Sequence, residues 1–325
     1  MEGVGLVPLL PVVGRKRGGR TRRALWIISA ILWVGILLHL LPIYWMLVSS
    51  VAGDLQIFNH PLALWPHPAY WQVYALLLHG ATELLPLPMG VFLKNSAILV
   101  LGVMCTQIPI SILAGYAISR LHNRRWARVL FLFIVGTLMI PSEVTLIPSY
   151  LILKNFPFPV NTPLPHLDLL GTYWAVILPA TAWGFAVLIF KGWFDTLPQE
   201  VMDAARIDGA GEIRILMQVV LPLSLPVIAF LGYSTFTAVW DQFTWPLVVL
   251  GANPHRWPLS VALNTAQRSL VPSPTSSPNA MLAQGVLGWN GVMALAVLQA
   301  LPVFLAFLLF REQIIRGVKI TGFQV

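Results

Sequence analysis

The sequence predicts an all-α protein that crosses a membrane about six times. Of its 325 residues, 57% are hydrophobic and only 10% are charged, a balance that excludes a soluble protein. Several apolar runs exceed the roughly 18 to 20 residues that a helix needs to span the hydrocarbon core. The single cysteine, Cys105, lies inside one of these runs and has no partner for an intrachain disulfide. We therefore expect one helical bundle without a separate soluble domain.

The bundle is expected to follow a basic tail. Residues 1–23 are predicted to form a cytoplasmic tail, and residues 24–325 a single transmembrane domain. The first apolar run is too long for the hydrophobic part of a signal peptide, so we expect an uncleaved first span. Pro141 and Pro148 interrupt the third span, and the apolar piece 243–250 is too short to cross, which makes it re-entrant or interfacial. The spans are predicted at 24–49, 91–118, 129–153, 171–194, 218–240 and 288–310.

Basic residues predict the orientation of these spans. Nearly all of the 20 lysines and arginines lie in the amino-terminal tail or in the segments after the second, fourth and sixth spans. By the positive-inside rule, both termini and residues 197–217 therefore lie in the cytoplasm. The positive charge lies beside spans and is not interleaved with exposed aromatic residues on a soluble domain, which argues against nucleic acid as a partner. The only exceptions, which lie at or beyond the outward ends of the predicted spans, are Lys94, Lys154, Arg256 and Arg268.

Residues 197–222 form a polar island between two apolar runs. Thr196 and Gln199 have the spacing of a capping box, and Pro198 is tolerated in the first turn of a helix. Gly209 can adopt the left-handed conformation that ends a helix. The sequence thus predicts a helical elbow over 197–217 that lies parallel to the membrane surface. The alternative is an amphipathic loop helix without a partner.

The elbow also carries a family resemblance. The pattern Asp203-Ala204-Ala205, Gly209, Val219 and Leu221-Pro222 is similar to the EAA signature of membrane subunits of binding-protein-dependent ABC importers. The first position is usually Glu in that family, and Asp203 keeps the charge with a shorter side chain. The resemblance extends over about residues 24–325 and includes the stretches LMIPSEVTLIP, WDQFTWPL and ALPVFLAFLLFREQIIRG. Within the family, the sequence most resembles the carbohydrate-uptake permeases of the maltose type.

This resemblance implies a fold, partners and a role for the elbow. The fold is that of a type I importer permease, and the elbow is its coupling helix, which docks on an ATPase. The implied partners are a homologous second permease subunit, two ATPase domains or subunits and an extracytoplasmic solute-binding protein, assembled in the lipid bilayer of a prokaryotic cytoplasmic membrane. Coupling residues are expected at Asp203, Ala204, Ala205, Arg206, Asp208 and Gly209.

No residue pattern supports catalysis or a cofactor in this chain. The sequence lacks a phosphate-cradling glycine-rich loop, a zinc-binding H-E-x-x-H pattern and paired carboxylates inside the bundle. We therefore expect a protein that is not an enzyme and has no metal site, with ATP and Mg²⁺ bound by the partner ATPase.

Polar residues inside predicted spans are candidates for a transport path. Glu143 follows Pro141 and, by counting along a straight helix, lies roughly 21 Å across the bilayer, where it either lines a cavity or lies near the outer surface. Asn95 either faces the pore or makes a hydrogen bond that packs helices. His39 is expected to pack toward the bundle.

The segment WDQFTW presents a second group of candidates. Trp240, Asp241, Gln242 and Trp245 lie near the outer mouth of the predicted bundle. Tryptophan rings beside hydrogen-bonding side chains suit the apolar faces and hydroxyls of a sugar, but they also suit an aromatic belt at the membrane interface. Similarity to the W-N-D-F-x-W-P run of carbohydrate permeases favours the sugar.

The sequence therefore predicts a subunit that forms half of the pathway of an ATP-driven importer for a sugar or sugar-like solute. The alternative is a secondary transporter driven by an ion gradient, which would need paired acidic residues in broken helices near the midplane. Glu143 is the only acidic residue well inside a predicted span, which disfavours that alternative. Oligosaccharides, monosaccharides, polyols and glycerol phosphodiesters all remain open as the solute.

Overall fold

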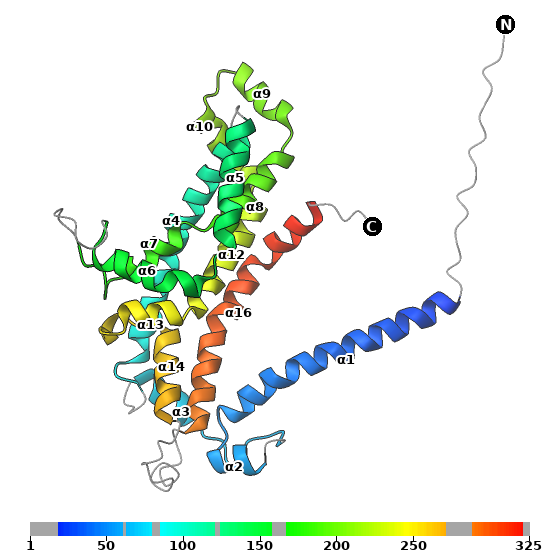
Figure 1. Ribbon diagram of the computed structural model, residues 1–325. Helices are drawn as coiled ribbons and strands as arrows, with labels where there is room; N and C mark the ends of the chain where they lie inside the picture. The colour runs from blue at the N-terminus through cyan, green and yellow to red at the C-terminus, as the bar shows by residue number, and fades with distance from the viewer. Residues whose placement is uncertain are drawn as a thin grey trace.

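The described part of the chain is almost entirely helical (Figure 1). The computed structural model describes residues 19–60, 63–79, 85–120, 124–157, 167–270 and 288–320. Within these ranges, the only β-type pairing is an isolated bridge between Phe156 and Leu167. The all-α prediction is confirmed. Most of the predicted basic tail and the proline-rich stretch 271–280 lie outside the described residues.

Four of the predicted spans correspond to helices that are long and apolar enough to cross a membrane. The fourth span along the chain, predicted at 171–194, consists of two helices separated by a short break at Ala182 and Trp183. The helices of these spans are α1 (Gly19–Ser49), α4 (Met89–Arg120), α7 (Trp174–Thr181) with α8 (Gly184–Thr196), and α16 (Trp289–Ile320).

The third predicted span is bent sharply. Helix α5 (Arg124–Leu138) and helix α6 (Ser142–Lys154) meet at 99° at Pro141. Proline disfavours helical conformation in the residue before it and lacks the N–H that would continue the ladder. The depth of about 21 Å predicted for Glu143 from a straight helix is therefore wrong, because Glu143 lies in the first turn of α6, beyond the bend.

The fifth predicted span is also bent. Its first part lies in a π-helical turn (Leu216–Val220) and α11 (Leu221–Leu223), which continue α10 (Glu212–Ile215) of the predicted elbow, and its second part is α12 (Leu225–Asp241). The two parts meet at 77°. The bend falls between Pro222 and Pro226, so the crossing segment is mainly α12.

Short helices complete the structure. The apolar piece predicted to be too short to cross forms α13 (Thr244–Leu250), a helix of only seven residues. The others are α2 (Asp54–Asn59), α3 (Gln72–His79), α9 (Gln199–Ile207), a 3₁₀ turn at Pro254–Arg256 and α14 (Leu259–Leu270).

Helix α4 forms the centre of the bundle, where it packs against α7, α8 and α12. Gly115 allows α4 and α8 to approach closely, since a Cβ atom there would lie 2.8 Å from the Cβ of Phe190 and 3.0 Å from the backbone nitrogen of Lys191. A distance below 3 Å is shorter than a van der Waals contact between carbon atoms. A larger residue at position 115 would push the two helices apart.

Helix α1 leaves the bundle as an arm (Figure 1). It packs on α16 near its carboxyl end, and most of its apolar side chains from Leu25 to Leu41 are exposed in this chain. His39 is exposed as well, with Nδ1 donating to the carbonyl oxygen of Gly35 at 2.7 Å. The prediction that His39 packs toward the bundle of its own chain is therefore wrong, because the whole helix stands apart from it.

A buried glutamine of α4 holds two neighbouring helices. Gln107 donates from Nε2 to the carbonyl oxygen of Ala180 at 2.8 Å, next to the break between α7 and α8. Its Oε1 accepts a hydrogen bond from the hydroxyl of Thr235 in α12 at 2.6 Å. A buried amide is tolerated when both of its ends are bonded, as here.

Replacing Gln107 by Leu is expected to destabilise the bundle by about 2 to 4 kcal/mol, because it leaves the Ala180 carbonyl and the Thr235 hydroxyl buried without a partner. The double variant Gln107→Leu/Thr235→Val removes one orphaned group and should recover part of that loss. Thermal melting of the purified protein in detergent measures both effects. An unchanged melting temperature in Gln107→Leu would contradict this role.

Candidate functional site

The elbow between α8 and α12 is anchored on the bundle by two apolar side chains. Met202 of α9 is 1% exposed and Ile215 of α10 is fully buried. Both belong to a cluster that includes Tyr116 of α4 and Phe190 and Phe194 of α8. The elbow is thus packed against the ends of the two helices that form the middle of the bundle.

Gly209 ends α9 in the conformation that the sequence predicts. Its φ angle is +81°, in the left-handed region. The N–H of Gly209 bonds to the carbonyl of Arg206, and the N–H of Ala210 bonds to that of Ala205, both at 3.0 Å. These two bonds form a Schellman motif with Gly209 at its left-handed position, so this residue fixes the turn between α9 and α10.

The predicted capping box at the start of α9 is wrong. The helix begins at Gln199 after Pro198, and no side chain caps it. The hydroxyl of Thr196 donates instead to the carbonyl of Trp193 at 2.7 Å. Thr196 is the last residue of α8, so its side chain satisfies a carbonyl of that helix, and Pro198 contributes a residue that needs no N–H partner.

Charged side chains tie the two halves of the elbow to α4. Arg206 donates from Nε to Glu212 Oε1 at 2.9 Å and from Nη1 to Asp203 Oδ1 at 2.7 Å. The phenol of Tyr116 donates to the other oxygen of Glu212 at 2.8 Å. The hydrogen bond to Glu212 is the main cause that raises the pKa of the Arg206 guanidinium above its usual range. Arg206 therefore keeps its charge at every physiological pH.

A second tie runs from the end of α4 to the start of α9. Arg120 donates from Nη1 to Gln199 Oε1 at 2.8 Å and from Nη2 to the carbonyl of Phe194 at 2.9 Å. Gln199 in turn donates to Asp203 at 3.3 Å. Both ends of the elbow are thus bonded to the same helix of the bundle, and the elbow is held as one body with it.

The coupling residues predicted from the sequence divide between two faces. Asp203 and Arg206 bond mainly within the elbow, and Ala205 is half-buried against the bundle. Ala204 and Asp208 are exposed on the side that faces away from the bundle. The structure therefore brings the predicted residues together on one short helix but turns Ala205 inward.

Two large apolar side chains on the outer face were missed by the sequence reasoning. Ile207 is 86% exposed and Ile213 is 80% exposed, and Val201 is exposed beside Ala204. Contiguous exposed apolar surface marks an interaction site, and Val201, Ala204 and Ile207 follow one another at one-turn spacing along α9. The available signal was the presence of isolated isoleucines within the charged island.

A hollow of about 440 Å³ lies between α12, α14 and α16. Asp241 lines it together with Gln299, whose Nε2 donates to Asp241 Oδ1 at 3.3 Å. The Oε1 atom of Gln299 is buried and accepts no hydrogen bond from the described residues. The other lining residues are Tyr233, Leu263, Ala296, Ala300, Val303, Phe304 and Phe307.

The other candidates in WDQFTW lie outside this hollow. Trp240 is buried, stacks on Phe236 and donates from Nε1 to the carbonyl of Gln299 at 3.0 Å. Trp245 donates from Nε1 to the carbonyl of Ala175 at 3.0 Å. Gln242 is half-buried, and its backbone carbonyl accepts from Ser260. Both tryptophans thus serve helix packing.

Asn95 is buried and fully bonded within this chain. Its Nδ2 donates to the carbonyls of His255 and Trp257, each at 2.9 Å, and its Oδ1 accepts from the hydroxyl of Tyr173 at 2.7 Å. This arrangement matches the packing alternative. Glu143 is exposed, accepts a hydrogen bond from the neighbouring Ser142 at 3.0 Å and does not line the hollow.

Comparison with known proteins gives consistent matches. Residues 107–320 match the model of the family described as binding-protein-dependent transport system inner membrane component. The sn-glycerol-3-phosphate transport system permease protein UgpE of Yersinia pestis is 33% identical over 288 residues, which cover 87% of this chain and 92% of that protein. The protein of the same name from Pectobacterium atrosepticum is 34% identical over 301 residues, 91% of this chain and 96% of that protein.

Solved structures match as well. A bacterial ABC transporter involved in the import of the acidic polysaccharide alginate contains a chain that superposes with a TM-score of 0.72 at 21% identity, covering 93% of this chain and 99% of that one. A chain of the bacterial alginate ABC transporter in complex with an alginate pentasaccharide-bound periplasmic protein gives a TM-score of 0.60 at 12% identity, covering 91% of this chain and 96% of that chain.

Replacing Glu212 by Gln is expected to loosen the elbow, because the carboxylate that joins Arg206 to Tyr116 loses its charge. Amide hydrogen exchange across 199–215 should become roughly five to ten times faster, which corresponds to a loss of about 1 kcal/mol, because the amide of Gln still accepts a hydrogen bond but carries no charge. The control is Glu200→Gln, which removes an exposed carboxylate of the same elbow outside this network. Equal acceleration in both variants would show that the network does not hold the elbow.

Proposed function

We propose that this chain, which belongs to the binding-protein-dependent transport system inner membrane component family, couples a partner ATPase to a sugar pathway through its elbow. As a member of this family it is a multi-pass permease subunit of the bacterial inner membrane, with no catalytic activity or cofactor of its own and with ATP hydrolysis in a separate subunit. An ion-gradient-driven transporter is thereby excluded. Both termini and the elbow are assigned to the cytoplasm by the distribution of basic residues.

The observation that supports coupling is the outer face of the elbow. Val201, Ala204 and Ile207 present apolar surface away from the bundle, and Asp208 lies beside them. Burial of such side chains in a cleft of the ATPase supplies binding energy, and the small Ala204 permits close approach. We assign Asp203 and Arg206 to holding the shape of this surface and Gly209 to setting the turn behind it.

The elbow is connected to the crossing helices by polar contacts that transmit its movement. Trp193 of α8 donates from Nε1 to the hydroxyl of Ser224 at 3.0 Å, at the bend before α12. Ser224 donates in turn to the carbonyl of Val220 at 2.6 Å. A displacement of α9 is thus carried into α8, and from there to α12 and the wall of the hollow. This linkage is the physical basis that we propose for coupling.

The arm formed by α1 supports a second permease subunit as a partner. Its exposed apolar side chains extend away from the bundle of this chain, so a neighbouring helical subunit has room to pack against them. The second subunit would supply the other half of the pathway and, with two ATPase domains, complete the transporter. A solute-binding protein would deliver the solute at the outer face.

We propose a neutral polyhydroxylated solute for the pathway. The wall of the hollow presents the Asp241 carboxylate, the side chain of Gln299 and the ring of Tyr233. These groups accept hydrogen bonds from hydroxyls and cover an apolar sugar face. None of the described residues lining the hollow is cationic, so nothing there pairs with a phosphate or carboxylate. This distinguishes a neutral sugar from the glycerol 3-phosphate named for the Yersinia relative.

The variant Ile207→Asp tests the coupling surface. Losing the burial of one isoleucine and adding a charge is expected to reduce retention of the ATPase subunit during affinity purification about tenfold or more. Uptake of solute into vesicles should fall with it, and the amount of the chain in the membrane should not change. The control is Leu64→Asp, which changes an apolar residue outside the elbow that is 74% exposed, against 86% for Ile207. Normal ATPase retention by Ile207→Asp would overturn the assignment.

The variants Asp241→Asn and Gln299→Ala test the pathway. Each is expected to reduce uptake of a labelled neutral oligosaccharide about five- to tenfold, because Asp241→Asn removes an acceptor for the solute hydroxyls and Gln299→Ala removes the amide that positions Asp241. Glu143→Gln is the matched control, since Glu143 lies outside the hollow. Uptake of labelled glycerol 3-phosphate is measured in parallel. Faster uptake of the phosphate than of any neutral sugar would contradict the proposed solute class.

A further inference from the structure

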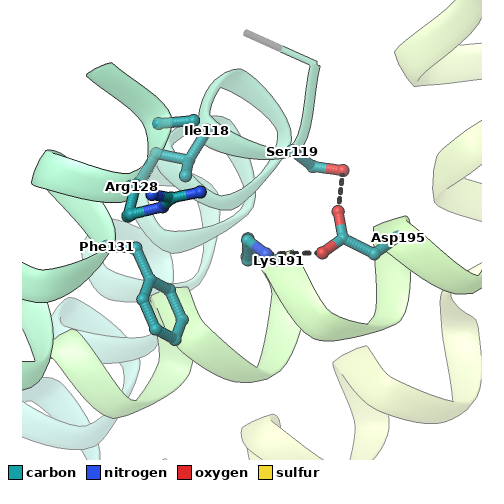
Figure 2. A pocket seen from close by; sticks show the side chains of 7 residues that line it. Ile118, Ser119, Arg128, Phe131, Lys191 and Asp195 are labelled. Atoms are coloured by element: carbon teal, nitrogen blue, oxygen red, sulfur yellow. Dashed lines mark hydrogen bonds and ion pairs between the residues drawn. The ribbon is translucent and has the colours of Figure 1, made fainter. Parts of the chain in front are cut away.

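A second cavity lies between α4, α5 and α8, at the ends of α4 and α8 that adjoin the elbow (Figure 2). Its volume is about 350 Å³. It is lined by the last turn of α4, the second turn of α5 and the last turns of α8. The lining residues are Ile118, Ser119, Ala127, Arg128, Phe131, Lys191 and Asp195.

Two cations face this cavity from different helices. Lys191 donates to Asp195 Oδ2 at 2.5 Å, and its ammonium lies 5.1 Å from the centre of the Phe131 ring. Arg128 lines the cavity from α5, and its guanidinium makes no hydrogen bond or ion pair with any described residue. The guanidinium therefore offers all its donors to a ligand.

The single carboxylate of the cavity is already occupied. Asp195 accepts from Lys191 on Oδ2 and from the hydroxyl of Ser119 on Oδ1 at 2.7 Å. Its charge compensates only one of the two cations, so the lining side chains carry a net charge of +1. A guanidinium beside an ammonium is suited to the oxygens of a phosphate group, which an arginine binds through two parallel hydrogen bonds.

The position of the cavity indicates which phosphate it meets. It lies where three spans end, beside the elbow, at the end of the bundle that carries the basic residues Arg120, Arg124, Arg125, Arg128 and Lys191. Helix α5 also carries exposed apolar side chains, among them Leu132, which lies one turn beyond Arg128. Basic pockets between spans on the cytoplasmic side hold lipid headgroups, with acyl chains along the neighbouring apolar surface. We propose that this cavity binds the phosphate of an anionic phospholipid of the cytoplasmic leaflet.

The site has a direct bearing on the elbow. Lys191 and Asp195 belong to α8, which leads into α9, whereas Arg128 belongs to α5 on the other side of the cavity. A phosphate held between Arg128 and Lys191 bridges the two helices at the point where the elbow begins. The lipid thereby fixes the spacing of α5 and α8 on the side of the ATPase.

Native mass spectrometry of the importer complex with this full-length chain, titrated with phosphatidylglycerol in detergent, tests the proposal. The double variant Arg128→Gln/Lys191→Gln is expected to bind the lipid at least about tenfold more weakly, because two charged donors are lost. Asp195→Asn is expected to bind it more tightly, since it frees Lys191 and raises the net charge of the cavity. Arg214→Gln, which removes a charge from α10 outside the cavity, should bind it as the wild type does.

The opposite responses of the variants separate binding from a structural effect. Weaker lipid binding by both the double variant and Asp195→Asn, or unchanged binding by the double variant, would overturn the proposal. Equal binding of phosphatidylcholine would also overturn it, because the net charge would then select nothing. A final measurement adds inorganic phosphate as a competitor. Displacement of the lipid by phosphate at matched concentration would assign the cavity to a soluble anion instead. If the double variant does not fold, Asp195→Asn tests the proposal by itself. Tighter lipid binding by this variant would support the proposal, and unchanged or weaker binding would overturn it.

Discussion

A helix break inside the membrane leaves backbone carbonyls without their usual N–H partners, and hydrocarbon offers no water to replace them. This chain meets that constraint with side chains from neighbouring helices. Pro179 has no N–H for the carbonyl of Ala175, and the indole of Trp245 bonds to that carbonyl instead. Gln107 does the same for Ala180 at the following break. The broken fourth span therefore depends on polar side chains from other parts of the bundle.

The same constraint explains where the structure is rigid and where it is able to transmit motion. Where a break is tied to another helix, the two helices are expected to move together, so a displacement of one reaches the other. The bend before α12 shows this best, since Ser224 is bonded both to its own helix and to Trp193 of α8. The elbow, anchored by Met202 and by the bonds of Arg120, lies at the end of this connected set.

Much of this fold was predictable because membrane spans are specified by composition over long windows. The lengths of the apolar runs predicted α1, α4 and α16 to within a few residues at most boundaries, and Gly209 predicted the end of α9. The angles at Pro141 and Ser224 were not predictable, since a proline marks where a helix breaks and packing sets its new direction. For the same reason the sequence misplaced Glu143 and did not reveal that α1 leaves the bundle of its own chain.

The candidate site shows a related limit, because a sequence pattern does not tell which face a side chain occupies. In the sequence, the charged residues of the elbow look available for a partner. In the structure, Arg206 donates hydrogen bonds to both Asp203 and Glu212. Apolar residues that look incidental, above all Ile207, occupy the outer face. Charged side chains that are already held in a fixed network lose little conformational entropy when a partner binds. The apolar surface beside them contributes favourable binding free energy when it is removed from water. The polar side chains of the elbow thus fix its shape, and the binding energy of its outer surface comes from the few exposed apolar side chains.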